Sequence, residues 1–243
     1  MNPSSETTRD TFFNGRLIVT QSRDGYRFSI DAVLLAATVK PKRGDTLLDL
    51  GTGCAIMPLV LAARHPDIHI CAVEIQSEMA HIAQQNVSDN HMQSRITVVH
   101  ADLRSLPSKE VCGPFDWVVS NPPYRAVHTG RINPNSQRAV ARHEMKVDLM
   151  QLLACCRRML RTGGACMIVY PAVRIVDLLA GMRQAGLEPK CLQAVHSCHG
   201  QVAKLILVQA VKGGRVGLCI KAPLTVYAPD GDYTEEVQEM LGL

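Results

Sequence analysis

The chain has 243 residues, of which 47% are hydrophobic and 20% charged, and it carries a net charge of +4. This size fits one α/β domain with short additions, and no apolar segment approaches the roughly 20 residues of a membrane-spanning helix. The polar N-terminus lacks the apolar core of a secretory signal and the nine cysteines show no framework spacing, so we expect a cytoplasmic protein with reduced thiols.

Four short apolar segments predict buried strands, because each is brief, rich in β-branched residues and free of polar alternation. They are residues 46–50, 69–75, 96–101 and 115–120. Helical periodicity over 56–65 and 77–90 separates the first three of these strands. The order βαβαβ predicts a parallel sheet with right-handed crossovers.

A helix, a strand and a second helix are predicted next along the chain. The first helix covers 148–161 and is closed by Gly163 and Gly164, because glycine favours helix C-termini. A fifth strand at 165–170 and a helix at about 173–185 follow. These elements extend the parallel sheet by one more crossover.

Two further strands are predicted at 191–196 and 203–210. Only six residues join them, too few for a parallel crossover, so they form an antiparallel hairpin at the sheet edge. The predicted fold is therefore α/β and Rossmann-like: a mostly parallel, seven-stranded sheet with an antiparallel edge hairpin and helices on both faces.

The turn after the first strand is typical of a nucleoside cofactor site. Gly51 and Gly53 let the backbone turn tightly and approach a ligand. Glu74 ends the second strand about 20 residues later, where a carboxylate can accept hydrogen bonds from ribose hydroxyls. A dinucleotide fingerprint would need glycine in place of Ile56, and Asp49 would repel a pyrophosphate but favour the ammonium of a methionine moiety. The turn thus favours S-adenosylmethionine over NAD.

Each of these acids also has a purely structural interpretation. Asp49 fits a buried acid that holds the turn together, and Glu74 fits a cap of the next helix. Asp102, just after the third strand, is placed either to bind the cofactor adenine or to cap the helical turn that follows it. The expected cofactor site also includes the adjoining residues Ile75 and Leu103, and Asn121 after the fourth strand.

The fourth strand ends in Ser120-Asn121-Pro122-Pro123-Tyr124. The prolines stiffen this turn, so that the Asn121 side-chain oxygen and the Pro122 carbonyl present two acceptors. Acceptors for both N–H groups of a planar exocyclic amine let its nitrogen pyramidalise and aim its lone pair at a sulfonium methyl. The Tyr124 ring offers a stacking face for a base or an amide. Alone, the motif also fits a rigid loop with a surface tyrosine.

Together, the glycine turn and the Asn-Pro-Pro-Tyr motif resemble those of the amino-methylating, S-adenosylmethionine-dependent class I methyltransferases. The chain is more closely similar to the bacterial family that N6-methylates the adenine 3′ of the anticodon in a valine tRNA, and the similarity covers almost its whole length. The closer resemblance rests on residues 25–35, 141–144, 223–227 and 233–236. It implies S-adenosylmethionine as cofactor and tRNA as partner.

The resemblance also implies roles for the flanking segments. Residues 1–44 are expected to cover the cofactor, with Phe28, Ser29 and Asp31 near its methionine end, although Ser29 also fits an ordinary helix cap. Ala55 stands where the wider superfamily usually has a third glycine, which implies somewhat altered cofactor affinity. The expected domains are the 1–44 segment, a class I methyltransferase domain at 45–210 and a C-terminal extension at 211–243 packed on it.

The segment 124–146 is long for a loop in a compact domain and is basic. Its arginines are expected to contact phosphates on either side of a flipped base, unless the loop is merely solvated and its charges pair locally. The candidates are Arg125, Arg131, Arg138 and Arg142. The cysteines and histidines between Cys191 and His199 match no common zinc spacing, so we expect no bound metal. We also expect the protein to be a monomer.

Three alternatives to tRNA adenine methylation stay open. Glutamine N5-methylation of a protein uses the same amine geometry, but such enzymes usually carry a sizeable helical domain before the first strand, where this chain has residues 1–44. A DNA adenine target is disfavoured because no target-recognition domain is visible. A non-catalytic RNA-binding module on the same scaffold would not need the intact motif at Asn121 to Tyr124.

Overall fold

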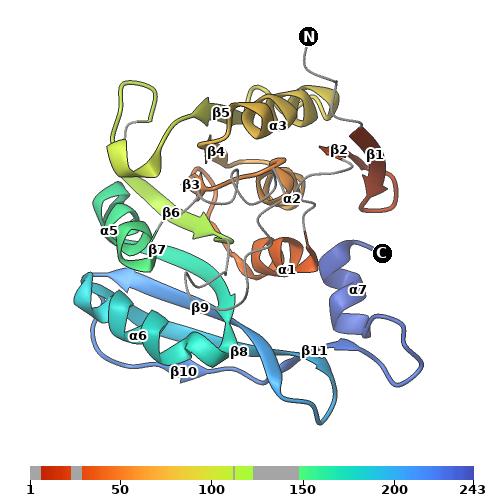
Figure 1. The fold of residues 1–243 in the computed structure, drawn as a ribbon, viewed down its shortest axis with the longest axis vertical. Coiled ribbons are helices and arrows are strands. Elements are labelled where there is room, and N and C mark those ends of the chain that lie inside the picture. The colour runs from red at the N-terminus through yellow and green to blue at the C-terminus, as the bar shows by residue number, and fades with distance from the viewer. Residues whose placement is uncertain (1–6, 23–28, 112, 123–147) are drawn as a thin grey trace, which may run out of the picture.

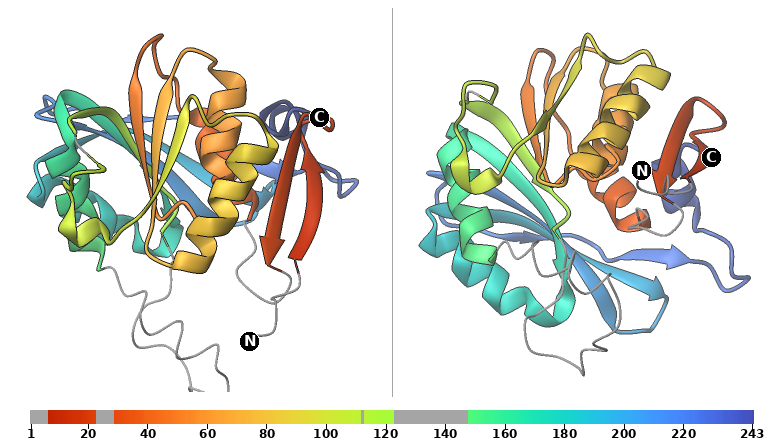
Figure 2. Two further views of the ribbon diagram at one scale, coloured as in Figure 1. Left: turned by 90° about the horizontal axis from the view of Figure 1, so that it is seen from above. Right: turned by 45° about the horizontal axis from the view of Figure 1, so that its top comes forward.

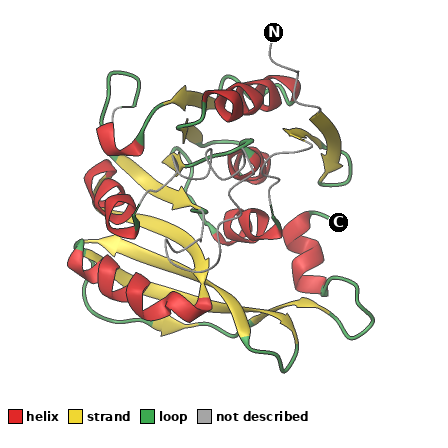
Figure 3. Ribbon diagram, in the orientation of Figure 1, coloured by secondary structure: helices red, strands yellow, loops and turns green. Residues whose placement is uncertain are grey.

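A computed structural model describes residues 7–22, 29–111, 113–122 and 148–243 of the chain. Its centre is a nine-stranded sheet in the order β10-β8-β9-β7-β6-β3-β4-β5, with β11 also paired to β8 (Figure 1). Helices cover both faces of this sheet (Figure 3). The predicted α/β architecture is confirmed.

The parallel half of the sheet matches the predicted strands closely. It comprises β3 (Thr46–Leu50), β4 (His69–Glu74), β5 (Ile96–His100) and β6 (Phe115–Ser120). Strand β3 pairs in parallel with both β4 and β6 and is buried on both faces, with Leu47 and Leu48 fully buried. Central strands of this kind read as continuous apolar runs, which is why the sequence predicts them to within a residue or two. Strand β5 lies at the sheet edge and is only partly buried, so its prediction as a buried strand is wrong in that respect.

Two groups of helices enclose two hydrophobic cores, one on each face of the sheet (Figure 2). One face carries α1 (Ile30–Thr38), α2 (Ile56–Arg64), α3 (Ser77–Asp89) and α7 (Glu235–Leu241). The other face carries α5 (Leu149–Met159) and α6 (Ile175–Gln184), with the short 3₁₀ helices η1 (Leu103–Ser105) and η2 (Ala172–Arg174) beside them. In the described part of the chain, no helix has the length and apolar character needed to cross a membrane.

The predicted antiparallel hairpin is confirmed, and the C-terminal part of the chain adds to its edge. Strands β8 (Leu187–Cys198) and β9 (Ala203–Lys212) pair with each other, and β9 pairs with β7 (Leu160–Pro171). Two short strands, β10 (Cys219–Ile220) and β11 (Leu224–Tyr227), lie parallel to β8. The predicted seven-stranded core thus carries two extra short strands at one edge.

The predicted helix end at Gly163 and Gly164 is wrong. Helix α5 ends at Met159, and both glycines lie inside β7, where the pairing with β6 shifts register. A side chain at Gly164 would meet the carbonyl oxygens of Arg161 and Asp116 at 3.0 Å. Close approach of two backbones, rather than helix termination, therefore explains the glycine at position 164.

An N-terminal hairpin that the sequence analysis did not predict packs against α3. It consists of β1 (Thr7–Phe12) and β2 (Leu17–Ser22) (Figure 2). The fully buried Asn86 of α3 accepts from the Thr20 N–H at 2.7 Å and donates to the carbonyls of Thr20 and Cys54, each at 2.9 Å. Asn90, one helical turn later, pairs in the same way with Ile18. The side-chain amides of Asn86 and Asn90 thus make the hydrogen bonds to the β2 backbone that a neighbouring strand would otherwise make.

We expect Asn86→Ala to lower the free energy of unfolding by about 3 kcal/mol, because the substitution leaves buried backbone groups of Thr20 and Cys54 without partners. Urea unfolding followed by circular dichroism measures this loss. The matched control is Gln93→Ala, near the same helix but exposed, where the change should stay within about 0.5 kcal/mol. Similar stability losses in the two variants would contradict the role given to Asn86.

Candidate active site

The carboxyl ends of the parallel strands bring the predicted site residues to one edge of the sheet. Leu50 of β3 is level with Val73 of β4, and Asp49 is level with Val119 of β6. The buried Ser120 hydroxyl donates to the Leu50 carbonyl at 2.8 Å. This bond fastens the start of the Asn-Pro-Pro-Tyr motif to the glycine turn. Ligands of open α/β sheets bind at the carboxyl ends of the strands, at the point where the strand order reverses.

Backbone hydrogen bonds and one carboxylate hold the glycine turn in place. The N–H groups of Gly51 and Thr52 donate to the Val73 carbonyl at 2.9 and 3.0 Å. Gly51 and Gly53 have φ angles of +77° and +59°, in the left-handed region that favours glycine. The Gly53 N–H donates to Glu74 Oε2 at 2.9 Å. The turn thus depends on the side chain proposed to bind ribose.

Glu74 is almost completely buried and links two elements of the site. Its Oε1 accepts from the backbone N–H of Gln76, the first residue before α3, at 3.0 Å, while Oε2 holds Gly53. Glu74 thus holds the residue that precedes α3, but its hydrogen bonds to described residues reach no N–H group within the helix, so its structural interpretation as a helix cap is supported only in part. A carboxylate offers about four acceptor positions, so these two backbone bonds leave capacity for ribose hydroxyls.

Asp49 is fully buried behind the turn, and neither of its carboxylate oxygens has a hydrogen-bond partner among the described residues. Burial raises the pKa of Asp49 to about 7, the neighbouring Thr52 hydroxyl opposes the rise, and the Glu74 carboxylate adds to it. Asp49 thus makes no hydrogen bond of good geometry with the described residues that would fasten the turn, although the Thr52 hydroxyl of the turn lies near enough to lower its pKa. An unpartnered carboxylate of this kind suits a cationic ligand group.

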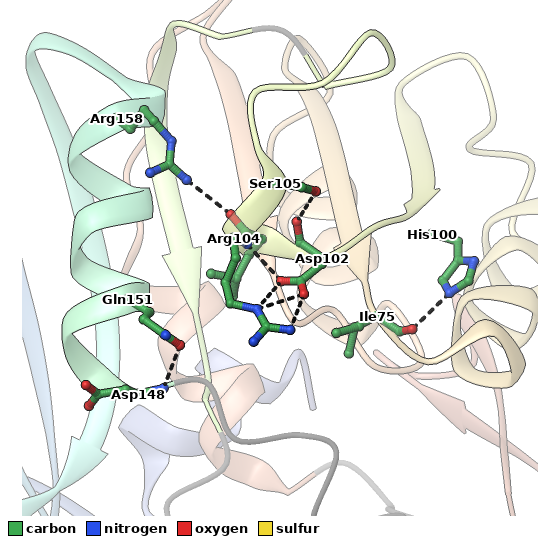
Figure 4. A network of polar contacts seen from close by, with 9 residues as sticks. Ile75, His100, Asp102, Arg104, Ser105, Asp148, Gln151 and Arg158 are labelled. Atoms are coloured by element: carbon green, nitrogen blue, oxygen red, sulfur yellow. Dashed lines mark hydrogen bonds and ion pairs between the residues drawn. The ribbon is translucent and has the colours of Figure 1, made fainter.

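Asp102 caps the short helix η1, as its structural interpretation predicted (Figure 4). It accepts from the Arg104 N–H at 2.8 Å, and its two oxygens also bind the Arg104 Nε at 3.0 and 2.8 Å. The hydrogen bonds to Arg104 lower the pKa of Asp102. Nearby, the Ile75 carbonyl lies 2.9 Å from Nε2 of His100, which ties the loop after β4 to β5. Leu103 is the first residue of η1, directly beside Asp102.

Ser29 and Asp31 begin helix α1. Ser29 is the N-cap residue, but its hydroxyl donates to Asp31 Oδ2 at 2.8 Å and does not accept from a backbone N–H of the helix. Partial burial is the main cause that raises the pKa of Asp31. The Ser29 and Asp31 side chains are thus hydrogen-bonded to each other at the start of α1.

Several predicted residues lie outside the described part of the chain. They are Phe28, Tyr124, Arg125, Arg131, Arg138 and Arg142. Asn121 and Pro122 are described and directly follow Ser120 at the site edge. Within the described ranges, no three His, Cys, Asp or Glu side chains are grouped to hold a metal ion.

Two residues near the glycine turn refine the sequence analysis. Asn86 donates to the Cys54 carbonyl of the turn and was missed, although it falls on the apolar stripe of its helix with Ile82 and Ala83, where a polar residue signals a buried contact. Ala55 has a left-handed φ of 66° and is fully buried in the hydrophobic core. Its methyl group therefore packs into the core.

Comparisons with known proteins agree with this geometry. The family model of the methyltransferase small domain matches residues 26–176. A protein of Aeromonas hydrophila named tRNA1(Val) (adenine(37)-N6)-methyltransferase is 29% identical over 89% of each chain, and one of the same name from Vibrio vulnificus is 32% identical over 69% of this chain and 68% of its own.

A solved structure described as a predicted O-methyltransferase of Agrobacterium tumefaciens superposes with a TM-score of 0.70 at 24% identity, over 86% of this chain and 94% of its own. That likeness confirms the predicted methyltransferase fold. The resemblance inferred from the glycine turn and the Asn-Pro-Pro-Tyr motif is confirmed as well, because the family model spans both motifs. The chain belongs to the methyltransferase small domain family.

Proposed function

We propose that this enzyme methylates the exocyclic N6 of an adenine in tRNA, with S-adenosylmethionine as the methyl donor. The observation that carries the proposal is the bond from Ser120 to the Leu50 carbonyl, which fixes Asn121 and Pro122 beside the glycine turn and Asp49. The names of the relatives from Aeromonas hydrophila and Vibrio vulnificus support adenine in tRNA1(Val) as the substrate class. We further propose that the enzyme is a cytoplasmic monomer.

The residues of the glycine turn and the neighbouring strand ends fit the cofactor. S-adenosylmethionine, when bound, supplies an electrophilic methyl group on a sulfonium. The buried Asp49 carboxylate would attract the methionine ammonium, and Glu74 would accept from the ribose hydroxyls beside Gly51 and Gly53. Residues near the adenine and the methionine end would complete the site. These are Ile75, Asp102 and Leu103 for the adenine, and Phe28, Ser29 and Asp31, within the covering segment 1–44, for the methionine end.

Asn121 and Pro122 would orient the amine that accepts the methyl group. The Asn121 side-chain oxygen and the Pro122 carbonyl accept its two N–H groups, so that the nitrogen lone pair points toward the cofactor. Tyr124 would stack on the adenine ring. No strong general base is needed, because the nitrogen loses its proton only after it has become cationic. Arg125, Arg131, Arg138 and Arg142 would bind phosphates around the extruded base.

The proposal is tested with labelled S-adenosylmethionine and three separate acceptors: total tRNA, total DNA and a release-factor preparation. We expect label in tRNA as N6-methyladenosine after nucleoside analysis. Label confined to protein would instead indicate glutamine methylation, and label in DNA a DNA adenine target. Absence of label from all three would leave a non-catalytic RNA-binding module.

We expect Glu74→Gln to weaken S-adenosylmethionine binding roughly 10- to 100-fold, because a neutral amide replaces a charged acceptor of the ribose hydroxyls. Calorimetric titration measures the affinity, and kcat at saturating cofactor should change little. Glu78→Gln, a neighbouring acid that is exposed in the first turn of α3, serves as the control. Equal affinities in the two variants would remove Glu74 from the cofactor site.

A further inference from the structure

A group of four basic side chains surrounds the end of helix α5, at the sheet edge opposite the active site. This group, here called the basic corner, consists of Arg157, Arg158, Arg161 and Lys212. Two adjoining hollows of about 500 and 470 Å³ open between these side chains, and Arg158 and Lys212 line both. No acidic or aromatic residue is among the residues that line the two hollows.

Most of the positive charge in the basic corner is not neutralised by an acid. Arg158 donates to the carbonyls of Leu106 and Leu103, at 2.5 and 3.2 Å, and Lys212 donates to the Leu160 carbonyl at 2.6 Å. Carbonyl oxygens fix these cations in place but carry no net charge. Such cations are therefore preorganised for an anion.

The other two arginines differ in their partners. Arg161 forms an ion pair with Asp116 at 2.5 Å, which lowers the net charge of the corner. Arg157 is exposed and has neither a hydrogen bond nor an ion pair with any described residue. The basic corner thus holds three cations, Arg157, Arg158 and Lys212, without an acidic partner among the described residues, while Asp116 and, more weakly, Asp45 act on Arg161.

Helix α5 connects the basic corner with the active site. It begins after Asp148, at the edge that carries Asn121, and ends where β7 starts, at the opposite edge. Its 11 residues span about 16 Å. Arg158 also contacts the carbonyl of Leu103, next to the proposed adenine-binding residue Asp102 (Figure 4). A nucleic acid with one base at Asn121 can therefore reach the basic corner along this face.

We propose that the basic corner binds the phosphodiester backbone of the RNA substrate, several nucleotides away from the methylated base. This inference rests on the proposed function, because it assumes that an RNA base occupies the site at Asn121. A free nucleotide fits the corner less well, since the lining residues offer no ring for stacking on a base and no carboxylate for a ribose. A phosphate backbone needs only fixed positive charge.

The test is the double variant Arg157→Glu with Lys212→Gln, in which the glutamine can still donate to the Leu160 carbonyl. We expect the KM for tRNA to rise roughly tenfold while kcat and the affinity for S-adenosylmethionine stay within about twofold. The slope of log affinity for tRNA against log salt should become shallower by about 1 to 2, one for each lost phosphate contact.

The control is Lys221→Glu, a charge reversal at an exposed lysine that follows β10 at the outer edge of the sheet. Its KM and salt slope should match those of the wild type. An unchanged KM and salt slope in the double variant, with a wild type that methylates tRNA, would overturn this inference alone. A wild type that methylates no RNA would overturn the proposed function and this inference together.

Discussion

Asn121→Ala is expected to reduce kcat for methyl transfer by at least about 10³-fold and to leave the affinity for S-adenosylmethionine within a few-fold. The adenine amine is planar because its lone pair is delocalised into the ring. Without the Asn121 oxygen, one N–H group loses its acceptor and the nitrogen is no longer held in the geometry that attacks the methyl group. The loss of one preorganised group at a reacting centre typically costs 10²- to 10³-fold in kcat, and the loss of orientation adds to it.

Asn121→Asp is the matched variant, because it keeps an oxygen at the same position. We expect it to retain more activity than Asn121→Ala by about tenfold or more, since one acceptor for the amine remains. Single-turnover kinetics with saturating tRNA and cofactor separate the chemical step from binding. Near-normal turnover by Asn121→Ala, in a variant that unfolds like the wild type, would remove the proposed mechanism.

Most of the parallel part of the fold was predictable because β3, β4 and β6 are largely buried on both faces, whereas β5 lies at the sheet edge. Strands such as β3, with its fully buried Leu47 and Leu48, read as short apolar runs between glycine and helix signals. The end of α5 was predicted wrongly, because the glycines at 163 and 164 serve backbone contacts between β6 and β7 that only the folded sheet creates. Local rules for glycine do not distinguish these two uses.

The N-terminal hairpin has a signal in the sequence. Asn14 and Gly15 join β1 to β2 with φ angles of 52° and 80°, and an Asn-Gly pair between two extended segments is a strong hairpin signal. The attachment of this hairpin through Asn86 and Asn90 was harder to foresee, because it pairs side chains with a backbone about 70 residues away.

The identity of the site residues was predictable from the sequence, but their burial and hydrogen bonding were predictable only in part. Asp49, Glu74 and Asn121 were each identified from spacing, and the strand register brings their segments to one edge. Whether a carboxylate there is already engaged depends on burial and on neighbours from other strands. Glu74 holds two backbone amides, whereas Asp49 has no hydrogen-bond partner among the described residues, and no sequence pattern separates these two cases.

Because the buried Asp49 carboxylate has no hydrogen-bond partner among the described residues, we expect its ionised form to lower the stability of the fold and to strengthen cofactor binding. In the folded chain its pKa is about 7, against an ordinary value of 3.8, so the folded state holds the proton more tightly than the unfolded state does. Stability is therefore present at low pH and is lost as the pH rises from about 4 to about 7. Between pH 5 and pH 8 this loss amounts to about 3 kcal/mol.

Asp49→Asn should remove that pH dependence, because an amide does not ionise. We expect the free energy of unfolding of the variant to exceed that of the wild type by a margin that grows by about 3 kcal/mol between pH 5 and pH 8. Urea unfolding at the two pH values measures the margin. Asp67→Asn, at an exposed site, should show no such growth. A margin that is the same at both pH values would mean that burial does not raise the pKa of Asp49.

Cofactor binding should respond in the opposite direction. The methionine ammonium stabilises the ionised form of Asp49, so wild-type affinity for S-adenosylmethionine should rise from pH 5.5 to pH 8, and binding near pH 6 should release a proton. Calorimetry in two buffers of different ionisation enthalpy detects that proton. In Asp49→Asn we expect affinity at least about tenfold weaker at pH 8 and no proton release, because the buried negative charge is gone. If Asp49→Asn were more stable than the wild type and bound S-adenosylmethionine equally tightly, Asp49 would not face the methionine ammonium. The buried acid at this turn would then have a role unrelated to the cofactor.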